Sequence, residues 1–188
     1  MRKVIFFMLT SVDGFFEGPG HNIDWHSVDE EFNEFANEQL NNTGVLLFGR
    51  VTYELMAGYW PTPEAKASDP EVAGAMNALQ KIVVSTTLDK AEWENTRLIK
   101  DNVAEEVGKL KQQAGKDMIV MGSSDLAVSL AEMGLVDEFR IIVNPVVLGE
   151  GKPVFSGFHG QMKLKLLKTR TFGNGNVLLY YAPGEKAA

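Results

Sequence analysis

The stretch that decides the fold is Val45-Leu46-Leu47-Phe48-Gly49-Arg50-Val51-Thr52-Tyr53-Glu54-Leu55-Met56. Its four apolar residues predict a buried strand, and a helical pattern begins at Thr52 after a turn made by Gly49 and Arg50. A strand that runs directly into a helix places backbone N–H groups and the positive end of a helix dipole at one point. With Arg50 beside that point, the turn predicts a site for an anion, most naturally a phosphate. An ordinary strand-to-helix turn with a surface arginine is the alternative.

The composition predicts one globular domain over residues 1–188, with 45% hydrophobic and 23% charged residues. Acidic residues outnumber basic residues by 25 to 18, and the formal net charge of -7 argues against general nucleic-acid binding. The sequence contains no cysteine, which excludes disulfides and thiolate sites and fits the cytoplasm, where we expect this protein. No apolar run is long enough to span a bilayer. No spacing of His, Asp and Glu is typical of a metal site.

Strand and helix patterns alternate along most of the chain. Apolar runs predict strands at residues 3–10, 44–48, 81–85, 117–121 and 138–143. Two further strand patterns, 162–171 and 176–182, are joined by Gly173-Asn174-Gly175, which is a strong hairpin signal. This order predicts an α/β fold with helices on both faces of a largely parallel sheet and an antiparallel pair at one edge.

Two segments before the quoted stretch could contact a ligand. The loop 11–26 is rich in glycine and aromatic residues, which fits a flap over a ligand and equally a loop sealed onto its own core. Residues 27–40 follow as a helical pattern with Ser27 as the predicted N-cap of a capping box. Asp29 and Glu31 flank the apolar face of this helix. A carboxylate there could donate a proton over a pocket or remain a solvated charge at the helix start.

Three of the predicted strands end in small polar residues. These ends are Gly49-Arg50-Val51-Thr52, Ser85-Thr86-Thr87 and Gly122-Ser123-Ser124. In an open parallel sheet, ligands gather at the carboxyl ends of strands beside the following helices, so the three ends together predict a nucleotide site. Helix capping by Ser123 or Ser124 is the alternative for those two residues. The G-x-G-x-x-G fingerprint and the P-loop lysine motif are absent, which disfavours an ordinary Rossmann domain or an NTPase.

The chain resembles the dihydrofolate-reductase-like superfamily and, within it, the RibD C-terminal domain family of riboflavin-biosynthesis reductases. The matching stretches, in order over residues 2–182, are Ser11-Val12-Asp13-Gly14, Leu47-Phe48-Gly49-Arg50-Val51-Thr52-Tyr53, Val83-Val84-Ser85, Val120-Met121-Gly122-Ser123, Leu135-Val136-Asp137-Glu138 and Pro145-Val146-Val147-Leu148-Gly149. The resemblance implies a three-layer α/β/α dihydrofolate-reductase-like fold. It also implies an NADPH-dependent reductase similar to dihydrofolate reductase or 5-amino-6-(5-phosphoribosylamino)uracil reductase. The substrate would be a pterin or a ribosylaminopyrimidine, and the assembly a homodimer.

The resemblance also implies the residues of the site. The cofactor would contact Gly49, Arg50 and Thr52 at its phosphates, Ser85 and Thr86 beside the adenosine, and Gly122, Ser123 and Ser124 at the pyrophosphate. Arg50 would favour the 2′-phosphate. The proton donor would be Glu31 by similarity to dihydrofolate reductases, or Asp13 by similarity to the riboflavin-type reductases. A nucleotide-binding module of the same fold without turnover is the alternative function.

Overall fold

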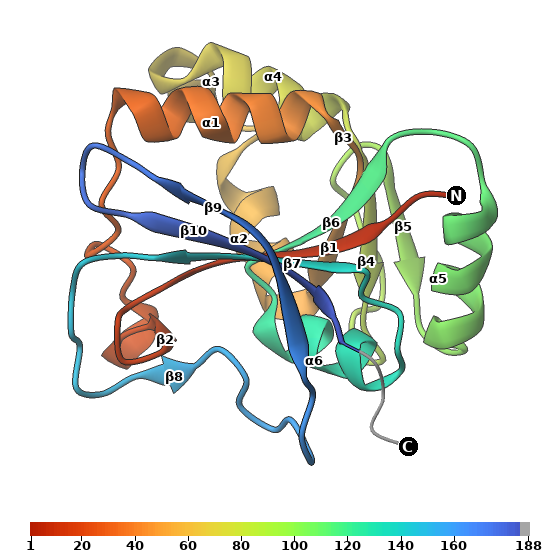
Figure 1. The fold of residues 1–188 in the computed structure, drawn as a ribbon. Helices are drawn as coiled ribbons and strands as arrows, with labels where there is room; N and C mark the ends of the chain where they lie inside the picture. The colour runs from red at the N-terminus through yellow and green to blue at the C-terminus, as the bar shows by residue number, and fades with distance from the viewer. Residues whose placement is uncertain (185–188) are drawn as a thin grey trace.

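The computed structural model describes residues 1–184, which form an eight-stranded sheet flanked by helices and a separate two-stranded ribbon (Figure 1). The strands are β1 (Val4–Thr10), β2 (Phe15–Glu17), β3 (Thr43–Gly49), β4 (Gln80–Val84), β5 (Thr96–Ile99), β6 (Asp117–Met121), β7 (Glu138–Val143), β8 (Lys152–Pro153), β9 (Leu164–Thr171) and β10 (Val177–Pro183). The helices are α1 (Glu30–Asn41), α2 (Arg50–Tyr59), α3 (Pro63–Ser68), α4 (Pro70–Ala78), α5 (Val103–Gln112) and α6 (Ser124–Glu132), with a short 3-10 helix, η1 (Pro19–His21). Within residues 1–184, no helix is long and apolar enough to cross a membrane.

The sheet order is β5-β4-β3-β6-β1-β7-β10-β9. Strands β1, β3, β4, β5, β6 and β7 pair in parallel, whereas β10 runs antiparallel to both β7 and β9. The predicted α/β fold, with a mostly parallel sheet and an antiparallel carboxyl-terminal hairpin, is therefore confirmed. The single domain predicted over residues 1–188 stays a prediction, and residues 185–188 lie outside the described part of the chain.

Successive side chains of a strand point to opposite faces of the sheet, so each face buries every second side chain. On β1, Ile5 and Phe7 face a cluster that also contains Phe32 and Phe35 of α1. Phe6 of the same strand belongs to the opposite cluster, to which α5 and α6 also contribute buried residues. Figure 1 shows α1, α3 and α4 on one side of the sheet and α6 on the other. This is the predicted three-layer α/β/α arrangement.

The start of helix α1 differs from the prediction. Asp29 is its N-cap and accepts the backbone N–H of Phe32 at 2.9 Å. Ser27 lies outside the helix, since its N–H donates to Asn144 Oδ1 and its carbonyl accepts from Asn176 Nδ2, both at 2.8 Å. The predicted Ser27 cap is wrong because these tertiary bonds hold its backbone away from the helix. Serine and aspartate are both good N-caps, so local preference alone does not choose between them.

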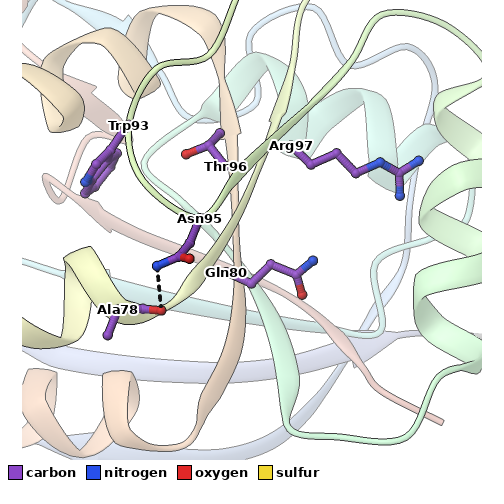
Figure 2. A pocket seen from close by; sticks show the side chains of 6 residues that line it. All are labelled: Ala78, Gln80, Trp93, Asn95, Thr96 and Arg97. Carbon is purple, nitrogen blue, oxygen red and sulfur yellow. Dashed lines mark hydrogen bonds between the residues drawn. The ribbon is translucent and has the colours of Figure 1, made fainter.

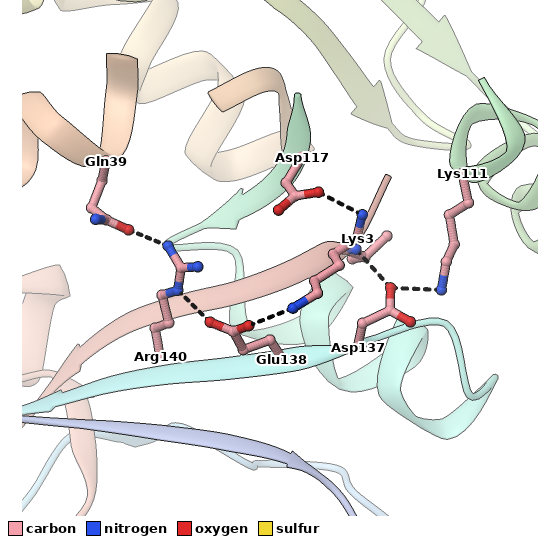
Figure 3. A network of polar contacts seen from close by, with 8 residues as sticks. Lys3, Gln39, Lys111, Asp117, Asp137, Glu138 and Arg140 are labelled. Carbon is pink, nitrogen blue, oxygen red and sulfur yellow. Dashed lines mark hydrogen bonds and ion pairs between the residues drawn. The ribbon is translucent and has the colours of Figure 1, made fainter. Parts of the chain in front are cut away.

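A polar network secures the amino end of β1 to its two neighbours (Figure 3). The backbone N–H of Lys3 donates to Asp117 Oδ1 at 2.8 Å, and that of Val4 donates to Asp137 Oδ2 at 2.8 Å. Asp117 begins β6 and Asp137 precedes β7, so the two carboxylates hold β1 between these strands. These bonds fix the amino end of β1 between its two neighbours.

Glu138 is the most deeply buried carboxylate of this network. It is 6% exposed and forms ion pairs with Arg140 at 2.7 Å and Lys3 at 3.2 Å. Arg140 in turn donates to Gln39 of α1, which links the strand to the helix above it (Figure 3). Burial by itself raises the pKa of Glu138, but the bonds to Arg140 and Lys3 outweigh it and leave the pKa below the ordinary value.

Candidate nucleotide site

The three polar strand ends predicted from the sequence meet in the structure. Strands β4, β3 and β6 are consecutive in the sheet and parallel, so their carboxyl ends lie at the same edge. Gly49 pairs in register with Val84, the residue before Ser85. The backbone N–H of Gly49 donates to Ser123 Oγ at 2.7 Å, which joins the ends of β3 and β6 directly. A Cβ placed on Gly122 would lie 3.6 Å from Thr52 Cγ2, so α2 begins against the same turn.

Two helices begin at this junction without a side-chain cap. Helix α2 follows Gly49, which has no side chain to offer. Helix α6 follows Ser123, whose hydroxyl accepts from Gly49 and does not cap its own helix. Gly122 has a φ of +72°, a conformation that favours glycine and turns the chain from β6 into α6. The backbone N–H groups of both helix starts are therefore available to a negatively charged ligand.

Ser124 supplies a further polar group at this edge. It is the first residue of α6, it is 3% exposed, and its hydroxyl has no hydrogen-bond partner within residues 1–184. A buried hydroxyl without a partner is costly in a folded protein. Its presence at the start of α6 fits a ligand that hydrogen-bonds at this position, as the predicted contact of Ser124 with a nucleotide would require.

Ser85 stabilises the turn after β4 through its side chain, a role that sequence reasoning missed. It is 8% exposed, and its Oγ accepts the backbone N–H groups of Thr87 at 3.1 Å and Leu88 at 2.9 Å. The side chain thereby closes the turn that follows β4. Thr86, between these residues, is exposed. The structure places both predicted residues beside the end of β3, with Thr86 the more accessible of the two.

Arg50 is the first residue of α2 and borders an open hollow of about 640 Å³. The residues that line this hollow are Arg50, Glu54, Thr87, Leu88, Asp89 and Lys90. Arg50 Nη1 lies 2.8 Å from Glu54 Oε2, and both side chains are about half exposed. Sequence reasoning missed Glu54 and Lys90 as neighbours of Arg50. The spacing of four residues between Arg50 and Glu54 on one helix was the available signal for the first of them.

The loop 11–26 is held at its start by Asp13. The Asp13 carboxylate accepts the N–H groups of Leu148 at 3.1 Å and Gly149 at 2.7 Å. Strand β2 within the loop then pairs with β8. Hydrogen bonding to Ser11 and to the backbone of Gly149 and Leu148 lowers the pKa of Asp13 to about 2. Asp13 is therefore ionised at neutral pH and acts as an acceptor for the 148–149 turn.

The far end of the same loop is held at Ser27. Asn144, which follows β7, accepts its N–H, and Asn174 and Asn176 of the β9–β10 hairpin donate to its carbonyl at 3.1 and 2.8 Å. The loop therefore crosses from β1 to α1 between two fixed ends. Both attachments lie at the carboxyl ends of β1 and β7, the same edge as the three polar strand ends.

Glu31 is attached to the same hairpin. Its carboxylate accepts the N–H of Gly173 at 2.8 Å and pairs with Arg170 at 3.1 Å. These two contacts, the first above all, keep the pKa of Glu31 below its ordinary value. Neither Glu31 nor Asp13 retains a proton at neutral pH, so the geometry favours an anchoring role for each. Their predicted part in catalysis stays a prediction.

A second hollow of about 450 Å³ lies at the other end of β4, where that strand begins (Figure 2). Its lining residues are Ala78, Gln80, Trp93, Asn95, Thr96 and Arg97. The Asn95 amide donates to the carbonyls of Asn77 and Ala78, and Arg97 pairs with Glu106. We place the candidate site at the carboxyl ends of β3, β4 and β6, where the three predicted polar segments meet, and not in this hollow.

The model of the RibD C-terminal domain family matches residues 2–178. The chain belongs to the RibD C-terminal domain family. This RibD C-terminal domain is 36% identical over 182 residues to the uncharacterized protein YyaP of Bacillus subtilis (strain 168), covering 96% of this chain and 94% of that protein. The predicted family resemblance is therefore confirmed.

Solved structures show the same fold at low sequence identity. A putative riboflavin biosynthesis protein from Shewanella sp. PV-4 matches with a TM-score of 0.74 at 19% identity, covering 98% of this RibD C-terminal domain and 100% of the other chain. Dihydrofolate reductase from Enterococcus faecalis, complexed with NADP(H) and RAB-propyl, matches with a TM-score of 0.65 at 15% identity, covering 97% of both chains. These likenesses confirm the dihydrofolate-reductase-like fold.

Proposed function

We propose that this protein is an NADPH-dependent reductase acting on a small heterocyclic compound of the pterin or ribosylaminopyrimidine type. The observation that carries the proposal is the junction of Gly49 with Ser123, where two helices without side-chain caps begin at one sheet edge. Such an edge suits the pyrophosphate of a dinucleotide. Support comes from the family, and from the fold shared with a dihydrofolate reductase that is complexed with NADP(H).

The residues proposed to hold the cofactor are Gly49, Arg50, Thr52, Ser85, Thr86, Gly122, Ser123 and Ser124. The orphaned hydroxyl of Ser124 and the backbone of Gly122 would face the pyrophosphate, and Arg50 with the 85–90 turn would face the adenosine end. When bound, NADPH supplies a hydride to the substrate. The task of the chain is to orient the two molecules and to exclude water with the 11–26 loop.

We propose anchoring roles, not proton donation, for the two predicted catalytic carboxylates. Asp13 holds the start of the 11–26 loop, Glu31 joins α1 to the β9–β10 hairpin, and both are ionised at neutral pH. The proton that accompanies the hydride would then come from water. Asp13→Asn and Glu31→Gln should lower turnover without moving the pH profile of kcat. A displaced or lost limb of that profile in either variant would restore the carboxylate as the donor.

A homodimer is proposed through strand β9. This strand forms one edge of the described sheet, and Leu164, Leu166 and Leu167 on it are 36%, 51% and 49% exposed. An exposed edge strand with apolar side chains favours association with another chain. A cytoplasmic location is proposed with it, as expected for a chain without cysteine.

The test of the proposed function is titration of NADPH and NADH against the wild type and Arg50→Ala, followed by assays of NADPH oxidation with dihydrofolate and ribosylaminopyrimidine substrates. We expect selective NADPH binding that falls on loss of Arg50, and oxidation with one substrate class. Binding without oxidation of NADPH by any substrate would favour the alternative, a nucleotide-binding module without turnover. Absence of binding by both cofactors would contradict the proposal.

A further inference from the structure

The hollow beside Arg50 carries charges of both signs. Arg50 and Lys90 line it from two elements, the start of α2 and the loop after β4, and Glu54 and Asp89 line it as well. A site built only to attract a phosphate would have no need for carboxylates beside its cations.

Glu54 is bound to Arg50 from the next turn of the same helix, with Nη1 and Oε2 2.8 Å apart. Residues four apart lie on one face of a helix, so the carboxylate and the guanidinium are neighbours and can pair. The pair is 44% and 47% exposed, so it stands at the rim of the hollow and can open at small cost. A phosphate dianion that approaches Arg50 meets the negative charge of this carboxylate.

We propose that Glu54 is a specificity-determining residue that competes with the 2′-phosphate of the cofactor for Arg50. The inference rests on the proposed NADPH function and extends it to the choice between phosphorylated and unphosphorylated dinucleotides. NADH carries a hydroxyl in place of that phosphate and meets no repulsion from Glu54. The carboxylate thus reduces the preference for NADPH that an unpaired arginine would confer, so the wild type prefers NADPH by a smaller factor than a chain without Glu54 would.

The matched control is Glu92, which pairs with Lys90 of the same hollow at 3.1 Å. Glu92→Gln removes one negative charge near a cation, as Glu54→Gln does, but leaves Arg50 and its partner untouched. That pair is 77% and 78% exposed, so opening it has little effect on stability and the variant differs from the wild type chiefly by one negative charge. A general effect of net charge would act on both variants alike, whereas competition for Arg50 acts only on Glu54→Gln.

The experiment measures Kd for NADPH and NADH on wild type, Glu54→Gln, Glu92→Gln, Arg50→Gln and the Glu54→Gln/Arg50→Gln double variant. We expect Glu54→Gln to tighten NADPH about two- to fivefold, the range of an exposed ion pair, with NADH unchanged. Glu92→Gln should change neither Kd, and the double variant should match Arg50→Gln. Melting curves would verify that every variant is folded.

Two results would overturn the inference in different ways. An unchanged ratio of the two Kd values in Glu54→Gln, or an equal gain in Glu92→Gln, would refute competition for Arg50 while the proposed cofactor function stands. Failure of the wild type and all variants to bind either cofactor would refute the proposed function and this inference with it.

Discussion

Lys81 is a fully buried cation at the start of β4, with an exposed fraction of 0%. Its Nζ donates to the carbonyls of Met76 and Asn77, both at 2.9 Å, and of Leu79 at 2.7 Å. These carbonyls lie at the end of α4, where a helix leaves acceptors without partners inside it. The ring of Trp93 covers the amine at 4.4 Å from its centroid. Lys81 therefore closes the carboxyl end of α4 from within the core.

Burial makes this charge costly. It lowers the pKa of Lys81 from 10.5 to about 8, although the charge of Glu94 acts in the opposite direction. At about 1.4 kcal/mol for each pKa unit, the difference corresponds to roughly 3 kcal/mol. The pKa is lower in the folded chain than in the unfolded chain, so between about pH 8 and 10.5 the unfolded state binds more protons. The contribution of Lys81 to stability therefore rises with pH across that window.

The perturbation is Lys81→Met, which keeps an unbranched side chain but removes the charge and the three donors. Urea unfolding of both proteins between about pH 7 and pH 10 should show the wild type gaining roughly 2–3 kcal/mol relative to the variant. The difference between the free energies of unfolding of the two proteins cancels the contributions of other groups that titrate in the same range. Lys100→Met, at an exposed position, is the control and should show a constant difference. A wild-type advantage over Lys81→Met that stays constant or shrinks as pH rises would refute the reasoning.

Two further predictions concern residues at the ends of interior strands. Ser123→Ala leaves the Gly49 N–H without its acceptor and should lower the free energy of unfolding by about 1–3 kcal/mol in urea unfolding, whereas Ser129→Ala, on the exposed side of α6, should cost less than about 0.5 kcal/mol. Equal losses in the two variants would argue that the Ser123 bond is unimportant. Glu138→Gln weakens the pairing with Arg140 and should cost about 1.5–3 kcal/mol at neutral pH. Since the pKa of Glu138 is lowered in the folded chain, this loss should disappear as pH falls through the folded pKa, and a loss that persists in acid would contradict an electrostatic origin.

Much of the fold follows from local patterns in the sequence. The apolar runs of β1 and β3 predict strands because both faces of the sheet are covered, so side chains that point to either layer are buried. The Gly173-Asn174-Gly175 turn predicts the β9–β10 hairpin, since only a few residue types adopt its backbone conformation. The convergence of the Gly49, Ser85 and Gly122 ends was also predictable, because parallel strands share one carboxyl edge.

The partners of several polar side chains were decided by tertiary structure. Ser123 accepts from Gly49 because β6 lies next to β3, although its hydroxyl is equally suited to bind a ligand. Asp13 and Glu31 are of a residue type that can donate a proton. In the fold, their carboxylates accept backbone N–H groups of residues 149 and 173, which are distant in the sequence. A hydroxyl or carboxylate bonds to whatever group the fold brings within about 3 Å. That choice depends on strand order and register, which neither residue type nor spacing along the chain encodes.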